Sequence, residues 1–295
     1  MVLRGADAGV AMLAGADLRD ADLTGTSLER AELAGADLRG ANLAGACLRE
    51  ATLSGANLAG ANLQSAVLEA ALAGGARMAD ASLRDADLRR ADFKGADLAG
   101  ACLAGATLHE TDLSGATLEG ADLTGARLCR SEPLWAATLW GARMDRCCLR
   151  DVVAAGALLS GARLAGADLR GVDLQETQLR GAGLRRADLR DADLRRAMLD
   201  GADLTEADLR GANLAGAALT RACLRNADLT GAILEGADLR EADLQGANLS
   251  GARCARASFW RARLWGARTK GGDFLDADTT GATLPSDFDW VVIEP

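Results

Sequence analysis

Leucine recurs at every fifth position along nearly the whole chain, and the residue two places before it is usually Ala. The five-residue frame holds from Leu18 to Leu128, with Ala73, Met78 and Phe93 in place of Leu. It resumes one residue out of step at Leu139 and ends at Leu284. The positions between carry mostly Asp, Asn, Arg, Glu, Ser and Gly. The pattern therefore alternates two apolar and three polar positions with a strict period of five.

A period of five fits neither regular element. On an α-helix, five steps of about 100° place successive Leu residues about 140° apart, so they spiral around the helix without forming an apolar stripe. On a flat strand, an odd spacing sends alternate Leu residues to opposite faces. The chain must instead turn after each unit so that every Leu faces one common axis, and this is a solenoid in which each coil stacks on its neighbours.

Each slot of the unit then has a predicted place. Leu and the small residue two places before it point inward, and the other three slots point outward. Gly is frequent two places after Leu, as at Gly15 and Gly166, which is typical of a corner. Because Arg30 and Glu50 fill the same slot, we expect corners there without a positive φ angle.

Repeated units such as Ala36 to Gly40 and Ala237 to Glu241 resemble the A(D/N)LXX consensus of the pentapeptide-repeat family. The resemblance covers nearly the whole chain. It implies an all-β fold, a right-handed quadrilateral β-helix with four units in each coil. About 14 coils would then account for the 295 residues.

Breaks in the period predict four segments. Residues 1–128 form an N-terminal stack, residues 129–136 an interrupting loop or bulge, and residues 137–284 a C-terminal stack. Residues 285–295 leave the repeat and form a C-terminal cap or a dimerisation tail.

The break at 129–136 contains one extra residue, and Pro133 there cannot donate to a backbone ladder. One interpretation is a tolerated insertion between two stacks. The other is a protruding loop that contacts a partner, because loops on rigid scaffolds often carry recognition. Trp135 and Trp140 favour the second interpretation, since exposed Trp residues frequently anchor interfaces.

A second Trp pair, Trp260 and Trp265, lies in a basic band. Residues 251–270 carry six bases and no acid, and residues 271–295 carry six acids and no base. The two indoles either pack over neighbouring Arg side chains on the wall or form a docking surface.

The tail is locally apolar and follows the last repeat. An open coil end exposes unpaired backbone and Leu side chains, so it needs a cap. The apolar residues of the tail can form this cap or the seam of a homodimer, and they are Phe288, Trp290, Val291, Val292 and Ile293.

Composition adds two expectations on the compartment. Seven Cys without a CxxC pair, with Cys147 and Cys148 adjacent, are typical of free thiols in a reducing cytoplasm. No signal peptide or apolar segment of membrane-spanning length stands out, so we expect a cytoplasmic protein without membrane contact.

Catalytic chemistry has little support. The single His, His109, lies in an outward slot beside Glu110 and offers neither a triad nor a metal cluster, so we expect a solvated surface residue. Gly residues occupy corner slots without a phosphate-loop Lys. We therefore expect no enzyme, no catalytic residue, no metal and no cofactor.

Surface charge is the remaining feature. With twenty residues in each coil, as the resemblance implies, one outward column contains four Asp, namely Asp168, Asp188, Asp208 and Asp228. This column is either a solvated wall with local ion pairs or an imitation of the phosphates of duplex DNA. The chain carries a net charge of −9, which argues against direct binding of nucleic acid.

The resemblance implies a function based on imitation of duplex DNA. Some members of the family are similar to DNA in charge and bind type II topoisomerases such as gyrase, which protects these enzymes from drugs or toxins. The alternative is a protein-interaction scaffold with an unrelated partner. It would dock through the surface bands of Trp and Arg residues, whose Trp residues are Trp135, Trp140, Trp260 and Trp265.

Overall fold

The computed structural model describes residues 2–129, 134, 137–286 and 288. Contacts within the chain group it into two compact units, Met1–Cys148 (unit 1) and Leu149–Pro295 (unit 2), which are described separately. Over the described ranges the backbone forms no helix and pairs through single-residue parallel β-bridges. The bridge residues recur every five positions, from Val2 to Arg127 and again from Thr138 to Thr283.

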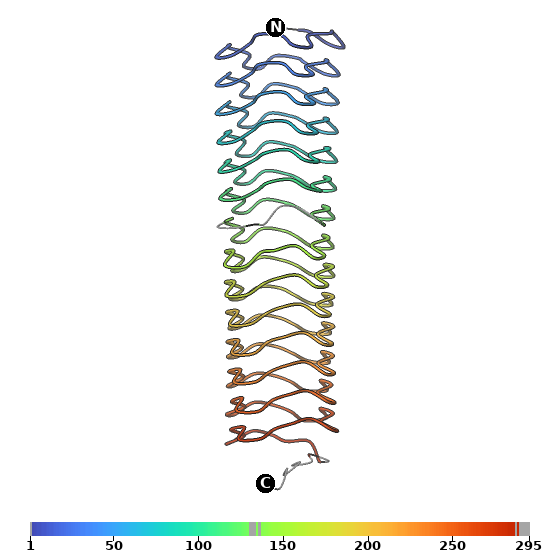
Figure 1. The fold of residues 1–295 in the computed structure, drawn as a ribbon, viewed down its shortest axis with the longest axis vertical. Helices are drawn as coiled ribbons and strands as arrows, with labels where there is room; N and C mark the ends of the chain where they lie inside the picture. The colour runs from blue at the N-terminus through green and yellow to red at the C-terminus, as the bar shows by residue number, and fades with distance from the viewer. Residues whose placement is uncertain (1, 130–133, 135–136, 287, 289–295) are drawn as a thin grey trace. The chain divides into compact units, whose positions relative to one another are not determined.

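Away from the change of frame, each bridge joins residues twenty positions apart, as in Val2↔Asp22 of unit 1 and Asp188↔Asp208 of unit 2. Twenty residues therefore make one coil, and its four five-residue sides form four walls. Figure 1 shows each unit as a stack of similar coils. The β-solenoid prediction is confirmed, whereas the handedness and the total of about 14 coils stay predictions.

Every five-residue side ends in a tight turn whose second residue has a positive φ angle. Gly fills many of these corners, but Arg30 has φ 58° and Glu50 has φ 55°. The expectation that such corners avoid positive φ is therefore wrong. The coil closes through the same left-handed residue at each corner, so its geometry imposes this conformation on Arg and Glu as well.

The inward slots form the core as predicted. Between Leu18 and Phe274, Leu and Ala in these slots are almost completely buried, and the substitutes Met78 and Phe93 are 0% and 1% exposed. Backbone amides of each coil donate to carbonyls of the next at 2.6–3.2 Å, for example Leu189 N to Asp208 O at 2.7 Å. The core of each unit is thus a narrow file of Leu side chains within a hydrogen-bonded tube.

The change of frame lies inside unit 1. Bridges that cross it join residues twenty-one positions apart, as in Thr117↔Thr138 and Arg127↔Cys148. The predicted extra residue is therefore present, and Leu134 still fills a buried slot. Pro133 and Trp135 lie outside the described residues. The protruding loop and the tolerated insertion therefore both stay predictions.

At the end of unit 2, aromatic rings replace Leu along the axis. The ring centroids of Phe259 and Phe274 lie 5.9 Å apart, and those of Phe274 and Phe288 lie 4.9 Å apart. Phe288 thus packs on the last aromatic residue of the core. Trp290, Val291, Val292 and Ile293 lie outside the described residues, so their role as cap or dimer seam stays a prediction.

Candidate functional site

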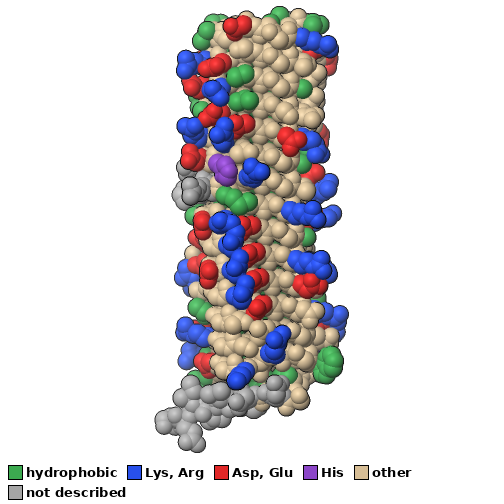
Figure 2. Space-filling model, turned by 90° about the vertical axis from the view of Figure 1, so that its right-hand side faces the viewer, with side chains coloured by type: hydrophobic (Ala, Val, Ile, Leu, Met, Phe, Trp, Pro, Cys, Tyr) green, Lys and Arg blue, Asp and Glu red, His purple; other side chains and the backbone are tan. Residues whose placement is uncertain are grey.

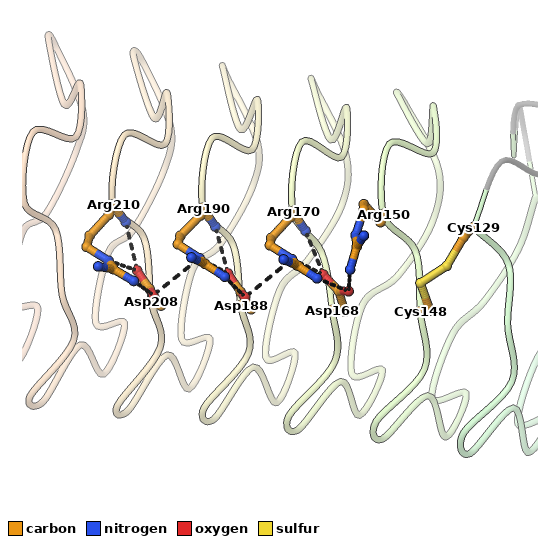
Figure 3. Close-up of polar contacts among 9 residues, drawn as sticks. All are labelled: Cys129, Cys148, Arg150, Asp168, Arg170, Asp188, Arg190, Asp208 and Arg210. Atoms are coloured by element: carbon orange, nitrogen blue, oxygen red, sulfur yellow. Dashed lines mark hydrogen bonds and ion pairs between the residues drawn. A yellow bond between two sulfur atoms is a disulfide. The ribbon is translucent and has the colours of Figure 1, made fainter.

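The four predicted Asp residues form one straight column on unit 2, which we call the Asp column. Bridges join Asp168 to Asp188, Asp188 to Asp208, and Asp208 to Asp228. Each occupies the bridge slot of its coil, where the backbone holds the side chains about 4.8 Å apart along the stack. Figure 3 shows three of these carboxylates in line.

An Arg two positions later clasps each of the first three carboxylates. Arg190 donates from Nε to Asp188 Oδ1 at 2.8 Å and from Nη2 to Oδ2 at 2.7 Å, which is a two-point clamp. Its Nε also lies 3.5 Å from Oδ2 of Asp208 in the next coil. Arg170 repeats this pattern toward Asp168 and Asp188, so acids and bases alternate along the column (Figure 3).

The clamps change the acidity of the column. The Arg190 side chain, with the Arg190 amide, holds the pKa of Asp188 below its usual value. At the end of the column, burial raises the pKa of Asp168, although Arg150 lies 2.8 Å away and acts against it. The Asp column is therefore a ladder of ion pairs and not a row of bare anions.

A matching column on unit 1 follows the same rule. Bridges join Asp17 to Asp37 and Asp37 to Asn57, and Arg19 and Arg39 clasp the two carboxylates. On the face shown in Figure 2, acidic and basic side chains lie side by side in rows along the stacked coils. Charge is thus largely compensated within each row.

The Trp residues differ in exposure. Trp265 of unit 2 is 73% exposed, and Trp140 of unit 1 is 45% exposed. Trp260 is half-buried, and the guanidinium of Arg261 lies 4.2 Å from its ring centroid. Packing under an Arg side chain therefore applies to Trp260, whereas Trp265 presents most of its surface to solvent. Trp135 lies outside the described residues.

The basic band of residues 251–270 is one complete coil, so its six cations are distributed around all four walls. Two of them reach back to acids of the preceding coil. Arg253 pairs with Glu235, and Arg263 Nη1 lies 3.8 Å from Asp243 Oδ2. This coil, which we call the basic coil, therefore combines paired and weakly paired cations with the exposed Trp265.

A groove beside the basic coil escaped prediction from the sequence. It has a volume of about 760 Å³ on unit 2. Its lining residues are Arg185, Asp203, Thr205, Arg221, Ala222, Cys223, Arg225, Glu241, Asp243, Arg261 and Arg263. The signal was available, because folding the sequence at twenty residues gathers these charges from five successive coils.

The cysteines contradict the expectation of free thiols at one place. Cys129 and Cys148 form a disulfide with a Cα–Cα distance of 5.6 Å (Figure 3). Because of the extra residue, Cys148 forms its bridge with Arg127 of the preceding coil. Cys129 lies two positions after Arg127, so the two cysteines lie diagonally across from each other on one wall of unit 1. The other five cysteines are free, and burial strongly raises the pKa of the Cys254 thiol. A reducing compartment no longer follows from cysteine usage.

His109 lies in an outward slot, as predicted, and keeps only part of its surface exposed. Its ring is half-buried, and its Nδ1 lies 2.5 Å from the carbonyl oxygen of Cys129 and donates to it. The contact fixes the tautomer and ties the side chain to the disulfide-bonded turn. Within the described residues, no three His, Cys, Asp or Glu side chains are placed to hold a metal ion. No helix there has the length and apolarity to cross a membrane.

These features define a class of protein, namely a β-solenoid with five-residue sides and charged columns on its walls. The sequence profile of the pentapeptide repeats matches residues 16–55, 51–95, 91–129, 147–186, 187–226 and 222–253. The chain belongs to the pentapeptide-repeat family. No curated protein sequence matches it.

Solved structures include relatives of several kinds. The chain is 31% identical to HetL, a pentapeptide repeat protein involved in heterocyst differentiation regulation in the cyanobacterium Nostoc sp. strain PCC 7120, over 89% of this chain and 90% of that one, with a TM-score of 0.25. It is 33% identical to a pentapeptide repeat protein from the Arabidopsis thaliana thylakoid lumen, over 39% of this chain and 66% of that one, with a TM-score of 0.26. It is 18% identical to QnrB1, a plasmid-mediated fluoroquinolone resistance protein, over 76% of this chain and 92% of that one, with a TM-score of 0.37. The roles named for these proteins differ from one another.

Proposed function

We propose that this chain is a non-catalytic binding protein that docks a protein partner on the walls of its solenoid, with the basic coil of unit 2 as the main contact. The observation that carries the proposal is Trp265, which is 73% exposed on a coil with no acidic residue. Trp and Arg are the residues that most often dominate the free energy of protein interfaces. The rigid backbone of the coil supports both without a conformational cost on binding.

Partner capture tests this proposal. The protein is immobilised, exposed to an extract of its host, and compared with the Trp265→Ala variant by quantitative mass spectrometry. A specific partner should be retained by the native protein and lost with Trp265→Ala. Leu275→Ala is the matched control, because Leu275 is also an exposed apolar residue of unit 2 and follows the basic coil. Equal capture by all three proteins contradicts the proposal.

A type II topoisomerase such as gyrase is the second candidate partner, and the Asp column favours it. The column repeats carboxylates at a fixed spacing on a rigid wall, which is the arrangement that imitation of DNA phosphates requires. The Arg clamps oppose it, because a cationic partner must compete with Arg170 and Arg190 for the same carboxylates.

A supercoiling assay with purified gyrase, with and without a quinolone, separates the two candidates. If imitation of DNA is correct, Asp188→Asn with Asp208→Asn should weaken the effect on gyrase. Arg170→Gln with Arg190→Gln should strengthen it, because the change uncovers the carboxylates. No effect of the native protein at micromolar concentration would exclude this candidate, and Trp265→Ala should leave any effect unchanged.

A further inference from the structure

The groove on unit 2 has a floor and two banks. Three successive bridges form the floor and join Asp203 to Cys223, Cys223 to Asp243, and Asp243 to Arg263. One bank is formed by the residues two positions before Cys223, Asp243 and Arg263, namely Arg221, Glu241 and Arg261. The other bank is formed by Thr205 and Arg225, which follow Asp203 and Cys223 by two positions, and by Arg185 of the coil before Asp203.

The arginines of the groove are paired differently from those of the Asp column. Arg221 donates to Glu241 only from Nε, at 2.8 Å, and Arg225 donates to Asp243 only from Nε, at 2.6 Å. Arg185 reaches Asp203 from Nη1 alone, at 3.3 Å. In the Asp column, by contrast, each clamp uses two nitrogens on one carboxylate. The guanidinium groups of the groove therefore keep donors with which a ligand can pair.

Positive charge is also in excess here. Five Arg and three acidic residues line the groove. Arg263 lies 3.8 Å from Asp243, whose carboxylate already accepts the stronger bond from Arg225. Arg261 is stacked on Trp260, which orders its guanidinium without neutralising it. The surplus lies where the groove meets the basic coil.

We propose that this groove binds a short, extended acidic segment of a partner protein, whose Asp or Glu carboxylates pair with the free edges of the guanidinium groups. The proposal rests on the proposed function and adds the chemistry of the partner. The floor spans three coil steps of about 4.8 Å, which matches four or five residues of an extended peptide at about 3.3 Å each. Bidentate pairing of Arg with carboxylates supplies both affinity and orientation.

Charge favours a peptide over a nucleic acid strand. Glu241 and Asp243 line the groove, and the whole chain carries −9. A polyanion is repelled by these charges beyond the contact itself. A peptide of four or five residues instead presents two or three carboxylates at the guanidinium groups alone.

Fluorescence anisotropy with a labelled peptide of seven residues, three of them Glu, tests the binding. The native protein should bind it, and the same peptide with Gln for Glu should bind about tenfold more weakly or less, as expected from the loss of charge-assisted hydrogen bonds. Arg225→Gln with Arg263→Gln should weaken binding to a similar extent. Arg195→Gln is the control, because Arg195 clamps Asp193 at two points on another wall of unit 2 and should leave binding within about twofold.

Cys223 supplies a second, independent measurement. It is a free, half-buried thiol on the floor, 3.2 Å from Thr205 Oγ1. Bound peptide should slow its alkylation by a maleimide. Cys102 is a free, half-buried thiol in the bridge slot of unit 1, and its alkylation should not change. Equal binding of the Glu and Gln peptides, or unprotected Cys223, overturns the proposal, and so does tighter binding of a five-nucleotide oligothymidylate.

The outcome is distinguishable from failure of the proposed function. If Trp265-dependent capture of a partner persists while the acidic peptide does not bind, the groove proposal alone is wrong. If the peptide binds but no partner depends on Trp265, the docking proposal alone is wrong.

Discussion

Corner residues show how side chains adapt to a left-handed backbone that the coil imposes. Where the corner is Asp or Asn, its side chain leans over the corner of the next coil, and that corner is Gly. An added Cβ at Gly100 would lie 2.3 Å from Asp80 Oδ1, and one at Gly246 would lie 2.4 Å from Asn226 Oδ1. Several corner Arg residues pair instead with a Glu one coil away, as Arg186 does with Glu206 at 2.7 Å. Successive corners at these positions are therefore matched in size or charge.

Gly100→Ala should destabilise unit 1 more than Gly120→Ala. Both glycines have φ 66°, so both substitutions cost about 1 kcal/mol for placing Ala in the left-handed region. Only the Cβ at position 100 meets Asp80, which adds about 1 kcal/mol, whereas position 120 is open. Urea unfolding of the two variants measures the difference. Asp80→Ala in the Gly100→Ala background should remove the excess, and equal costs at both positions would refute the matching of corners.

Arg190→Gln should make the stability of the protein less sensitive to acid. Arg190 lowers the folded pKa of Asp188 below the ordinary value of 3.8. The contribution of this ion pair to the stability of the folded protein is therefore fully present above pH 3.8, and it is lost as the pH falls through the folded pKa of Asp188. Thermal midpoints at pH 7 and pH 2 should differ less in Arg190→Gln than in the native protein. Arg256→Gln is the control, because Arg256 makes no ion pair in the described chain, and a matching reduction in that variant would contradict the assignment.

At the scale of one coil, the disulfide joins two sides at the point where the five-residue period fails. It closes a segment with a sequence separation of 19 residues, directly at the described edge of the 129–136 break. In the remaining coils of unit 1, cross-coil ion pairs hold neighbouring sides together, as Lys94 and Asp112 do at 2.9 Å. A covalent link therefore replaces a weak polar contact where the frame changes.

Cys148→Ser should lower the free energy of unfolding by about 3 kcal/mol, because closure of a loop of this length restricts the unfolded chain. Cys102→Ser removes a free thiol from a bridge slot and should cost less than about 1 kcal/mol. Denaturant unfolding with and without dithiothreitol gives the measurement. The reductant should destabilise the native protein and leave Cys148→Ser unchanged, and a response in both would place the effect elsewhere.

At the scale of a whole unit, each coil contacts its neighbours and no distant part of its own unit. The stability of such a solenoid is close to a sum of coil and interface contributions. Its register depends on the number of residues per coil, because each wall is defined by residues twenty positions apart. Length changes of twenty and of five residues should therefore have different consequences.

Deletion of residues 191–210 should leave a folded unit 2 that has lost one coil and kept all four walls. The deletion places Asp188 beside Asp228 in the Asp column and keeps Leu at every fifth position. Far-ultraviolet circular dichroism should be unchanged per residue. Deletion of residues 191–195 should also fold, but it moves every later wall by one side and separates Asp188 from Asp208. A supercoiling assay on the two deletions then reports whether an effect on gyrase depends on wall register. Unfolding of the twenty-residue deletion would contradict the solenoid account.

Much of the fold was predictable because almost every five-residue repeat has the same pattern of apolar and polar positions. Leu189 is buried for the same local reason as Leu38, so many repeats independently indicate that the Leu slot faces inward. The pairing of Cys129 with Cys148 was not predictable in the same way. It depends on a single extra residue, whose effect on the opposition of two slots becomes visible only when coils are stacked.

The candidate sites, like the fold, were predictable only in part. The twenty-residue coil that the family resemblance implies predicted the Asp column correctly as a column, because its members repeat at that interval. It could not show that Arg170 and Arg190 clasp the carboxylates at two points, since that depends on side-chain reach within and between coils. Sequence alone determined the inward and outward slots and hence the solenoid. Tertiary structure decided which outward residues neutralise one another and which keep free charge. The reason is that the residues that face one another on neighbouring coils are set by the stacking of the coils and not by any single five-residue repeat.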